Sequence, residues 1–188
     1  MRDRWKAFVR KVKVNGSVVP YTQEDCDLAA KRLGLRALPS SYSQYVQHFG
    51  YGEWESDLEI CVPAYAGLVG SLDELVRVER ATFEAWKGDG ARFVSDMKQL
   101  PAIISFGETT MGMSFGWDSR CVRDDHEMQI CLLELPQVFP LDCWDLLEFL
   151  DVYWLGNKLN EYYPFEGGWP TKPIFTVRQL QKPYMRPT

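Results

Sequence analysis

A short helix, a stop signal and a strand follow one another in LPSSYSQYVQHFGYGEWESDLEICVP, residues 38–63. The apolar side chains of the helix recur at i, i+3, i+4 and i+7, which places them on one face: Tyr42, Tyr45, Val46 and Phe49. Gly50 follows that stripe and favours the end of the helix. The alternation of residues 58–62 predicts a strand, and Pro63 closes it. We therefore expect a helix with one buried face, followed directly by a strand.

The segment between this helix and this strand combines acids with aromatic residues. Its acids all have odd numbers: Glu53, Glu55, Asp57 and Glu59. In an extended chain they would project to one side, with Trp54 and Leu58 on the other, because side chains alternate along a strand. The pattern predicts an acidic surface. It leaves two alternatives for Trp54, which either belongs to the core or is turned toward the surface by a bend.

Three further helices are predicted, each by a polar residue that can cap the first turn and by a glycine near the end. They span about residues 22–34, 71–88 and 142–156. The last of these begins with Asp142 and Asp145, which we expect to provide its cap.

Strands are predicted over residues 103–106, 111–117 and 128–135, where the apolar period changes to two. The sequence GETT, residues 107–110, is expected to form a turn, and residues 118–127 a polar loop. Helices, one strand, a helix, antiparallel strands and a final helix follow one another along the chain. This order predicts an α+β fold.

Charge is distributed unevenly along the chain. The formal net charge is −5, yet residues 1–14 carry +5 and residues 167–188 carry +4, which leaves −14 for residues 15–166. An acidic body disfavours nucleic acid as a partner, because phosphate binding requires a basic surface. It favours a basic protein through complementary fields. Solubility alone is the alternative explanation of the same charge.

The sequence predicts a cytoplasmic protein without metal or cofactor. Residues 1–16 lack the continuous apolar stretch of a secretion signal. No apolar run approaches the ~20 residues of a membrane helix. The five cysteines include no C-x-x-C pair and lie in apolar patterns, which suits reduced core thiols.

The sequence GMSFG, residues 112–116, matches the G-x-S-x-G motif of serine hydrolases. That motif requires Ser at a sharp turn between a strand and a helix, whereas Ser114 lies inside an alternating run. The histidine available downstream is His126, so a hydrolase that uses Ser114 and His126 is a minor alternative. The Gly-Ser-Gly side of this run predicts either a closely packed helix or a shallow binding groove.

Together, these motifs resemble the SUKH superfamily, the family of cell-wall assembly regulators and immunity proteins. The similarity covers about residues 20–155 and lies in LPSSYSQYVQHFGYGEW, in the strand LEICVP and in the strand pair IISFGETTMGMSFGWD. The matching positions are Leu38, Pro39, Tyr42, Phe49, Gly50, Phe106, Gly107, Gly112 and Asp118. The chain departs from the pattern at Tyr51, where many relatives carry Asn or Gly. The resemblance implies a SUKH-like domain with helices against a mostly antiparallel sheet. We expect one such domain over residues 1–188, with a basic N-terminal extension and an aromatic, Pro-rich C-terminal tail that fall outside the family pattern.

The resemblance also implies a protein-binding role without catalysis. Bacterial members of this family resemble antidotes that bind and neutralise a polymorphic toxin domain, often a nuclease, and fungal members act as regulatory scaffolds. We therefore expect an immunity protein with a basic toxin domain as partner, and a regulatory scaffold as the alternative. The expected partner-binding residues are Glu53, Trp54, Glu55, Asp57, Asp118, Asp124 and Asp125. Trp54 would be the buried anchor of the interface and the acids would pair with Lys or Arg.

Overall fold

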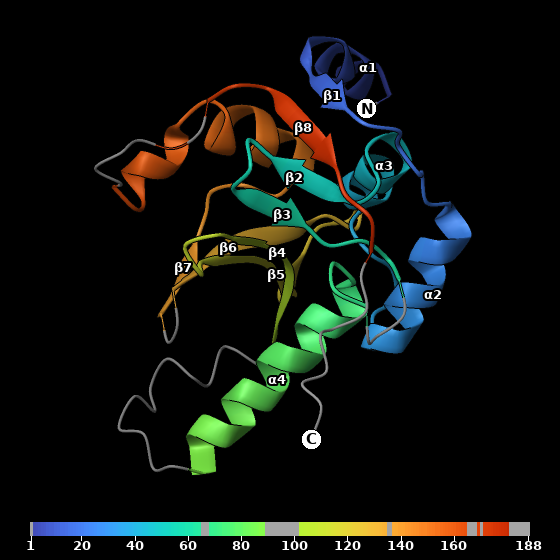
Figure 1. The fold of residues 1–188 in the computed structure, drawn as a ribbon. Helices are drawn as coiled ribbons and strands as arrows, with labels where there is room; N and C mark the ends of the chain where they lie inside the picture. Colours follow the sequence, from blue (N-terminus) through green and yellow to red (C-terminus); the bar gives the residue numbers. More distant parts are fainter. Residues whose placement is uncertain are drawn as a thin grey trace, which may run out of the picture.

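The computed structural model describes residues 2–64, 68–88, 102–134, 137–164, 169 and 171–180. Within these residues, eight strands form one sheet in the order β1-β8-β2-β3-β4-β5-β6-β7 (Figure 1). The strands are β1 (Lys13–Asn15), β2 (Gly52–Trp54), β3 (Leu58–Ile60), β4 (Ile103–Thr109), β5 (Ser114–Val122), β6 (Met128–Glu134), β7 (Gln137–Pro140) and β8 (Ile174–Val177). β1 and β8 pair in parallel and all other neighbours pair antiparallel.

The helices confirm the expected α+β class. They are α1 (Arg2–Lys11), α2 (Gln23–Leu33), α3 (Ser40–His48), α4 (Leu72–Gly88) and α5 (Leu146–Glu148), which continues as the π-helix η3 (Phe149–Trp154), followed by the 3-10 helix η4 (Lys158–Glu161). α1 and α3 lie on one side of the sheet, and α4 extends away from the other side (Figure 1). None of the described helices is long and apolar enough to cross a membrane.

Local signals explain where α2 begins and ends. Thr22 accepts a hydrogen bond from the backbone of Asp25, whose carboxylate in turn accepts one from the Thr22 amide. This reciprocal capping box satisfies two amides at the helix start. Gly34 ends the helix in the left-handed region, with φ +76°. The last helix begins at Asp145 and not at Asp142, because Asp145 Oδ1 accepts the amide of Glu148 at 3.0 Å.

The two ends of the chain are parts of the core. Trp5 and Phe8 of α1 are buried, and β8 inserts between β1 and β2, which carries Phe175 into the core. Arg4 and Lys11 pair with Asp145 and Asp151, so α1 is also tied to the helical segment α5–η3 by charge. The core therefore reaches beyond residues 20–155 on both sides.

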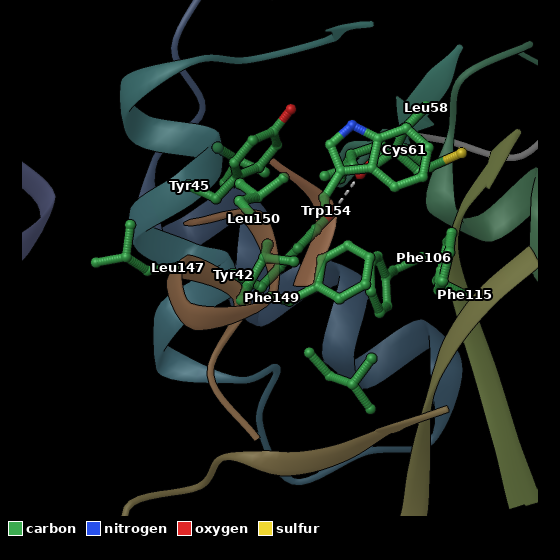
Figure 2. Packing of buried hydrophobic residues seen from close by; sticks show 14 of the residues in the cluster. Tyr42, Tyr45, Leu58, Cys61, Phe106, Phe115, Leu147, Phe149, Leu150 and Trp154 are labelled. Atoms are coloured by element: carbon green, nitrogen blue, oxygen red, sulfur yellow. Dashed lines mark hydrogen bonds between the residues drawn. The ribbon is translucent and has the colours of Figure 1, made fainter. Parts of the chain in front are cut away.

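The main core lies between the sheet and the helices of its first side. Figure 2 shows aromatic side chains from α3, β4, β5 and η3 that meet there. The hydroxyl of Tyr42 donates to the carbonyl oxygen of Cys61 at 2.8 Å, so this buried polar group is satisfied. Phe149 packs against Phe115, with ring centroids 4.8 Å apart. The stripe expected on α3 is buried as predicted.

Two strand boundaries differ from the expectation. Residues 107–109 belong to β4, so GETT is not a turn, and the chain reverses only over residues 110–112. Gly112 makes this possible with φ +81°, a conformation that glycine adopts without strain. β5 then begins at Ser114 and runs to Val122, into the segment expected as a polar loop. Pairing with β6 explains this extension, because the ladder holds polar residues in strand conformation as well.

Candidate functional site

The acidic segment after α3 forms a tight hairpin. Glu55 and Ser56 both have positive φ, 50° and 62°, and the chain turns back between Trp54 and Leu58. As a result, the four acids of this segment do not line one edge. Glu53 lies directly opposite Glu59 on the neighbouring strand, and the two carboxylates share one face of the sheet.

The row continues on β4. Glu59 is paired on its other side with Glu108, so glutamates of three adjacent strands stand side by side. Directly opposite residues in such ladders are about 4.5–5.5 Å apart. We call Glu53, Glu59 and Glu108 the acidic row. Three like charges at this spacing repel one another, and directly opposed like charges destabilise a sheet.

The acidic row is only partly neutralised. The guanidinium of Arg178 donates to Glu53, and the hydroxyl of Tyr51 donates to Oε1 of Glu59 at 2.6 Å. Among the described residues, none donates a hydrogen bond to the exposed Glu108. Partial burial and the charge of Glu59 raise the pKa of the Glu108 carboxyl. Arg178 thus compensates Glu53 at one end of the row, whereas the charge of Glu108 at the other end is uncompensated.

Glu79 of α4 adds a fourth carboxyl beside the row. Burial raises its pKa, and the charge of Glu108 acts in the same direction. The hydroxyls of Ser105 and Ser114 lie near the Glu79 carboxylate and favour its charged form. The two hydroxyls offset the effect of burial only in part, because the pKa of Glu79 stays above its usual value.

Trp54 is the clearest correction to the expected partner-binding residues. Its side chain is 0% exposed and packs against the rings of Phe8, Phe49 and Phe175, with centroids 5.7, 5.1 and 5.2 Å apart. The hairpin causes this placement, because it keeps Trp54 on the face opposite the acidic row. A partner on the surface therefore cannot use Trp54 as an anchor.

Two acids at the hairpin tip bind the chain itself. Oδ1 of Asp57 accepts the amide of Thr110 at 3.1 Å, which joins the hairpin to the turn between β4 and β5. Oε2 of Glu55 accepts the amide of Lys172 at 3.0 Å, just before β8. Both acids are half-buried. They help to hold the acidic row in place.

The remaining expected acids lie apart from the row. Asp118 is 5% exposed and makes a bidentate pair with Arg120, which holds the pKa of its carboxyl below the usual value. Asp124 and Asp125 are exposed in the turn after β5. β5 starts beside Glu108 at Ser114 and ends at Val122, roughly 26 Å away at 3.3 Å per residue. The seven expected residues therefore do not form one surface.

Ser114 and His126 also lie far apart, because they stand at opposite ends of β5. Ser114 pairs with Glu108 and Leu133 in the middle of the sheet, whereas His126 lies beyond the far end of β5. A nucleophile and its base must lie within about 2.6–3.2 Å of one another, so these two residues do not form a catalytic pair. Among the described residues, no cluster of three or more His, Cys, Asp or Glu is arranged to hold a metal ion.

The Gly-Ser-Gly side of β5 is closely packed at Gly116. A Cβ atom added at Gly116 would lie 2.6 Å from Cγ2 of Ile103 on the neighbouring strand. α4 packs against β4. The close contact at Gly116 is made by the neighbouring strand β4, whereas the space around Gly112 is open, so the choice between a packed helix and a groove stays a prediction.

Comparisons with protein-family models, with curated proteins and with solved structures find no match to this chain.

Sequence reasoning set Glu59 aside and missed Glu108, Glu79 and Arg178 as members of the site. Glu53 and Glu59 are symmetric about Ser56, so a predicted hairpin would have placed them opposite one another. Glu108 belongs to the segment that was expected to be a turn. Arg178 directly follows β8, a strand that the sequence after residue 161 does not predict because it has no apolar period. No local sequence pattern connects Arg178 with Glu53.

Proposed function

We propose that this protein is a protein-binding module whose acidic row binds a basic partner protein. The observation that carries the proposal is the row itself, in which, among the described residues, Arg178 pairs with Glu53 and no guanidinium pairs with Glu59 or Glu108. Such an arrangement lowers the stability of the free protein, since like charges oppose one another directly. A partner that supplies Lys or Arg side chains relieves the repulsion between the carboxylates. This relief contributes favourably to the free energy of binding.

The shape of the row restricts the partner. Its carboxylates are spaced by one strand each and lie on a rigid ladder, so they suit basic side chains spaced about 5 Å apart. Arginine can pair with such carboxylates through two parallel hydrogen bonds. The charge of −14 over residues 15–166 would accelerate the encounter with a basic protein.

The partner that we propose is a toxin domain, which the protein neutralises by binding. This step rests on the similarity to the SUKH superfamily in residues 20–155 and on the acidic body. If the toxin is a nuclease, the row would occupy the basic surface that otherwise binds phosphates. A regulatory scaffold of the same family would use the same row with a cellular partner.

The test uses the protein encoded by the neighbouring gene. If that protein ends in a variable C-terminal domain, this domain is expressed alone and titrated with the full chain by calorimetry. We expect a one-to-one complex that suppresses the toxicity of the domain in cells. A neighbour of unrelated type, with a cellular protein bound at the same row, would support the scaffold alternative.

Charge-matched variants test the acidic row in that complex. Glu59→Gln with Glu108→Gln should weaken binding by at least about tenfold, the effect of two lost charge pairs of ~0.7 kcal/mol each. The control is Glu24→Gln with Glu161→Gln, which removes the same net charge from exposed residues elsewhere. An equal loss in both double variants would mean that the row has no special role, and full affinity in the row variant would refute the proposal.

A further inference from the structure

A polar groove is lined by residues of α1, α3 and the start of α2, together with residues of the turn after β5. It consists of two hollows of about 600 and 540 Å³. Ala37 and His126 line both, so the hollows are neighbours with a common wall. Volumes of this size are typical of sites that bind small molecules or short peptides.

The larger hollow is lined by a second stripe of α3. Ser40, Ser43, Gln44 and Gln47 recur at i, i+3, i+4 and i+7, on the side that the aromatic stripe leaves open. Every one of these side chains is uncharged and able to hydrogen-bond. Amides and hydroxyls both donate and accept, as the peptide groups of an extended chain do.

The titratable residues of the groove are mostly basic. Among the described residues that line the larger hollow, none carries a carboxylate, whereas Lys6 lies there together with two histidines, His48 and His126. The smaller hollow adds Arg36 and Arg123 against one acid, Asp124. This balance is opposite to that of the body, which carries −14 over residues 15–166.

A turn at His126 determines which side chains face the groove. His126 has φ +66°, a left-handed conformation that few residues other than glycine adopt. The turn leaves its imidazole on the wall and sends the next carboxylate, that of Glu127, into the interior. There Glu127 accepts from the amide and the hydroxyl of Ser41, each at 2.7 Å. The carboxylate that follows His126 is therefore occupied inside the fold, whereas Asp124 lines the smaller hollow.

We propose that this groove binds an extended acidic peptide segment. The exposed amide of Gln47 on α3 would hydrogen-bond to its main chain, and Arg36 and Arg123 would pair with its carboxylates. This site lies apart from the acidic row and takes a ligand of opposite charge. The protein would thus bind two chains of different chemistry on two surfaces.

The experiment is a titration of the isotope-labelled full chain with the peptide tetraglutamate, followed by NMR amide shifts. We expect saturable shifts over residues 36–47 and 122–128, and weaker binding at high salt because the contacts are between charges. Tetraglutamine is the matched neutral peptide. Equal binding of tetraglutamine, or shifts spread over other surfaces, would overturn the proposal.

Two variants localise the effect. Arg36→Gln with Arg123→Gln should lower the affinity for tetraglutamate roughly fivefold or more, the loss expected for two exposed charge contacts. Lys172→Gln removes an exposed basic residue outside the groove and should leave the affinity within about twofold. Unchanged affinity in the groove variant, with its NMR spectrum otherwise intact, would contradict the proposal.

Discussion

Glu127 and Glu108 are glutamates at opposite ends of the same part of the sheet, and their surroundings differ in kind. The carboxylate of Glu127 is buried at the start of α3, whose own first residues offer no side-chain cap. It accepts two hydrogen bonds from Ser41, and the Ser41 hydroxyl accepts the amide of Leu146 at 2.9 Å. One carboxylate thereby joins α3, the turn after β5 and the start of α5.

Glu108 stands beside another carboxylate instead of a donor. Its neighbour across the ladder is Glu59, and its side chain is exposed. The pKa of both Glu108 and Glu127 is raised, in each case by burial first, with further contributions from acids nearby. The difference lies in the hydrogen bonds, because Glu127 is satisfied within the fold and Glu108 is not. We infer that Glu127 serves stability and that Glu108 remains available to a partner.

The largest expected effect is that of Glu127→Ala. At pH 5 this change leaves the buried amide and hydroxyl of Ser41 without acceptors and opens a cavity, so the free energy of unfolding should fall by about 3–4 kcal/mol. Chemical denaturation measures it. If the stability of the variant stayed within 1 kcal/mol of the parent, Glu127 would not have the stabilising role that distinguishes it from Glu108.

The second prediction concerns pH. Burial raises the pKa of Glu127 from 4.5 to about 7 in the folded protein. Between these values the folded state holds a proton that the unfolded state releases, so stability is greatest at low pH and is lost as the pH rises toward 7. The loss is about 1.4 kcal/mol per pH unit, or roughly 2–3 kcal/mol between pH 5 and pH 8.

Glu127→Gln provides the comparison for this titration, because it keeps the shape and an acceptor but binds no proton. The stability difference between parent and variant should shift by that amount across the same pH range, measured by denaturation at each pH. Other groups with shifted pKa values, such as Asp73 and Asp118, titrate in both proteins and cancel. Parallel stability curves for the two proteins would rule out a titration of Glu127 in this window.

The smallest expected effect has the opposite sign. Glu108→Gln should stabilise the protein by about 0.2–1 kcal/mol, because it removes one of two directly opposed charges. The gain should shrink in 1 M salt, where exposed charges are screened. Glu161→Gln, which changes an exposed acid outside the row, should alter stability little. A destabilised Glu108→Gln would show that its charge is compensated in the free protein.

The helices α2 and α3 could be predicted almost to the residue. Their signals are local, since Thr22 and Asp25 cap within one turn and the stripe of α3 repeats within nine residues. The strand β6 was also expected, because its residues are mostly apolar. In contrast, the tail after residue 161 has no period, and β8 forms only because β1 and β2 offer backbone partners on both sides.

The candidate site was predicted only in part. The acids near Trp54 were identified, and Glu53 does belong to the row. The chain, however, reverses at Glu55 and Ser56, which have positive φ. The acids therefore do not line one edge, and Glu53 instead lies opposite Glu59 on the neighbouring strand. The same reversal places Trp54 among Phe8, Phe49 and Phe175, which come from three distant segments of the chain.

Local sequence determines what depends on neighbours within a few residues: the helix limits, the alternation of the strands, the glycine turns and the acidic character of the body. The tertiary structure determines which charges meet. Glu59 meets Glu108, Glu53 meets Arg178 and Ser41 meets Glu127 across 49, 125 and 86 residues of chain. Such contacts follow from strand pairing and core packing, which bring together residues whose separation in sequence carries no periodic signal.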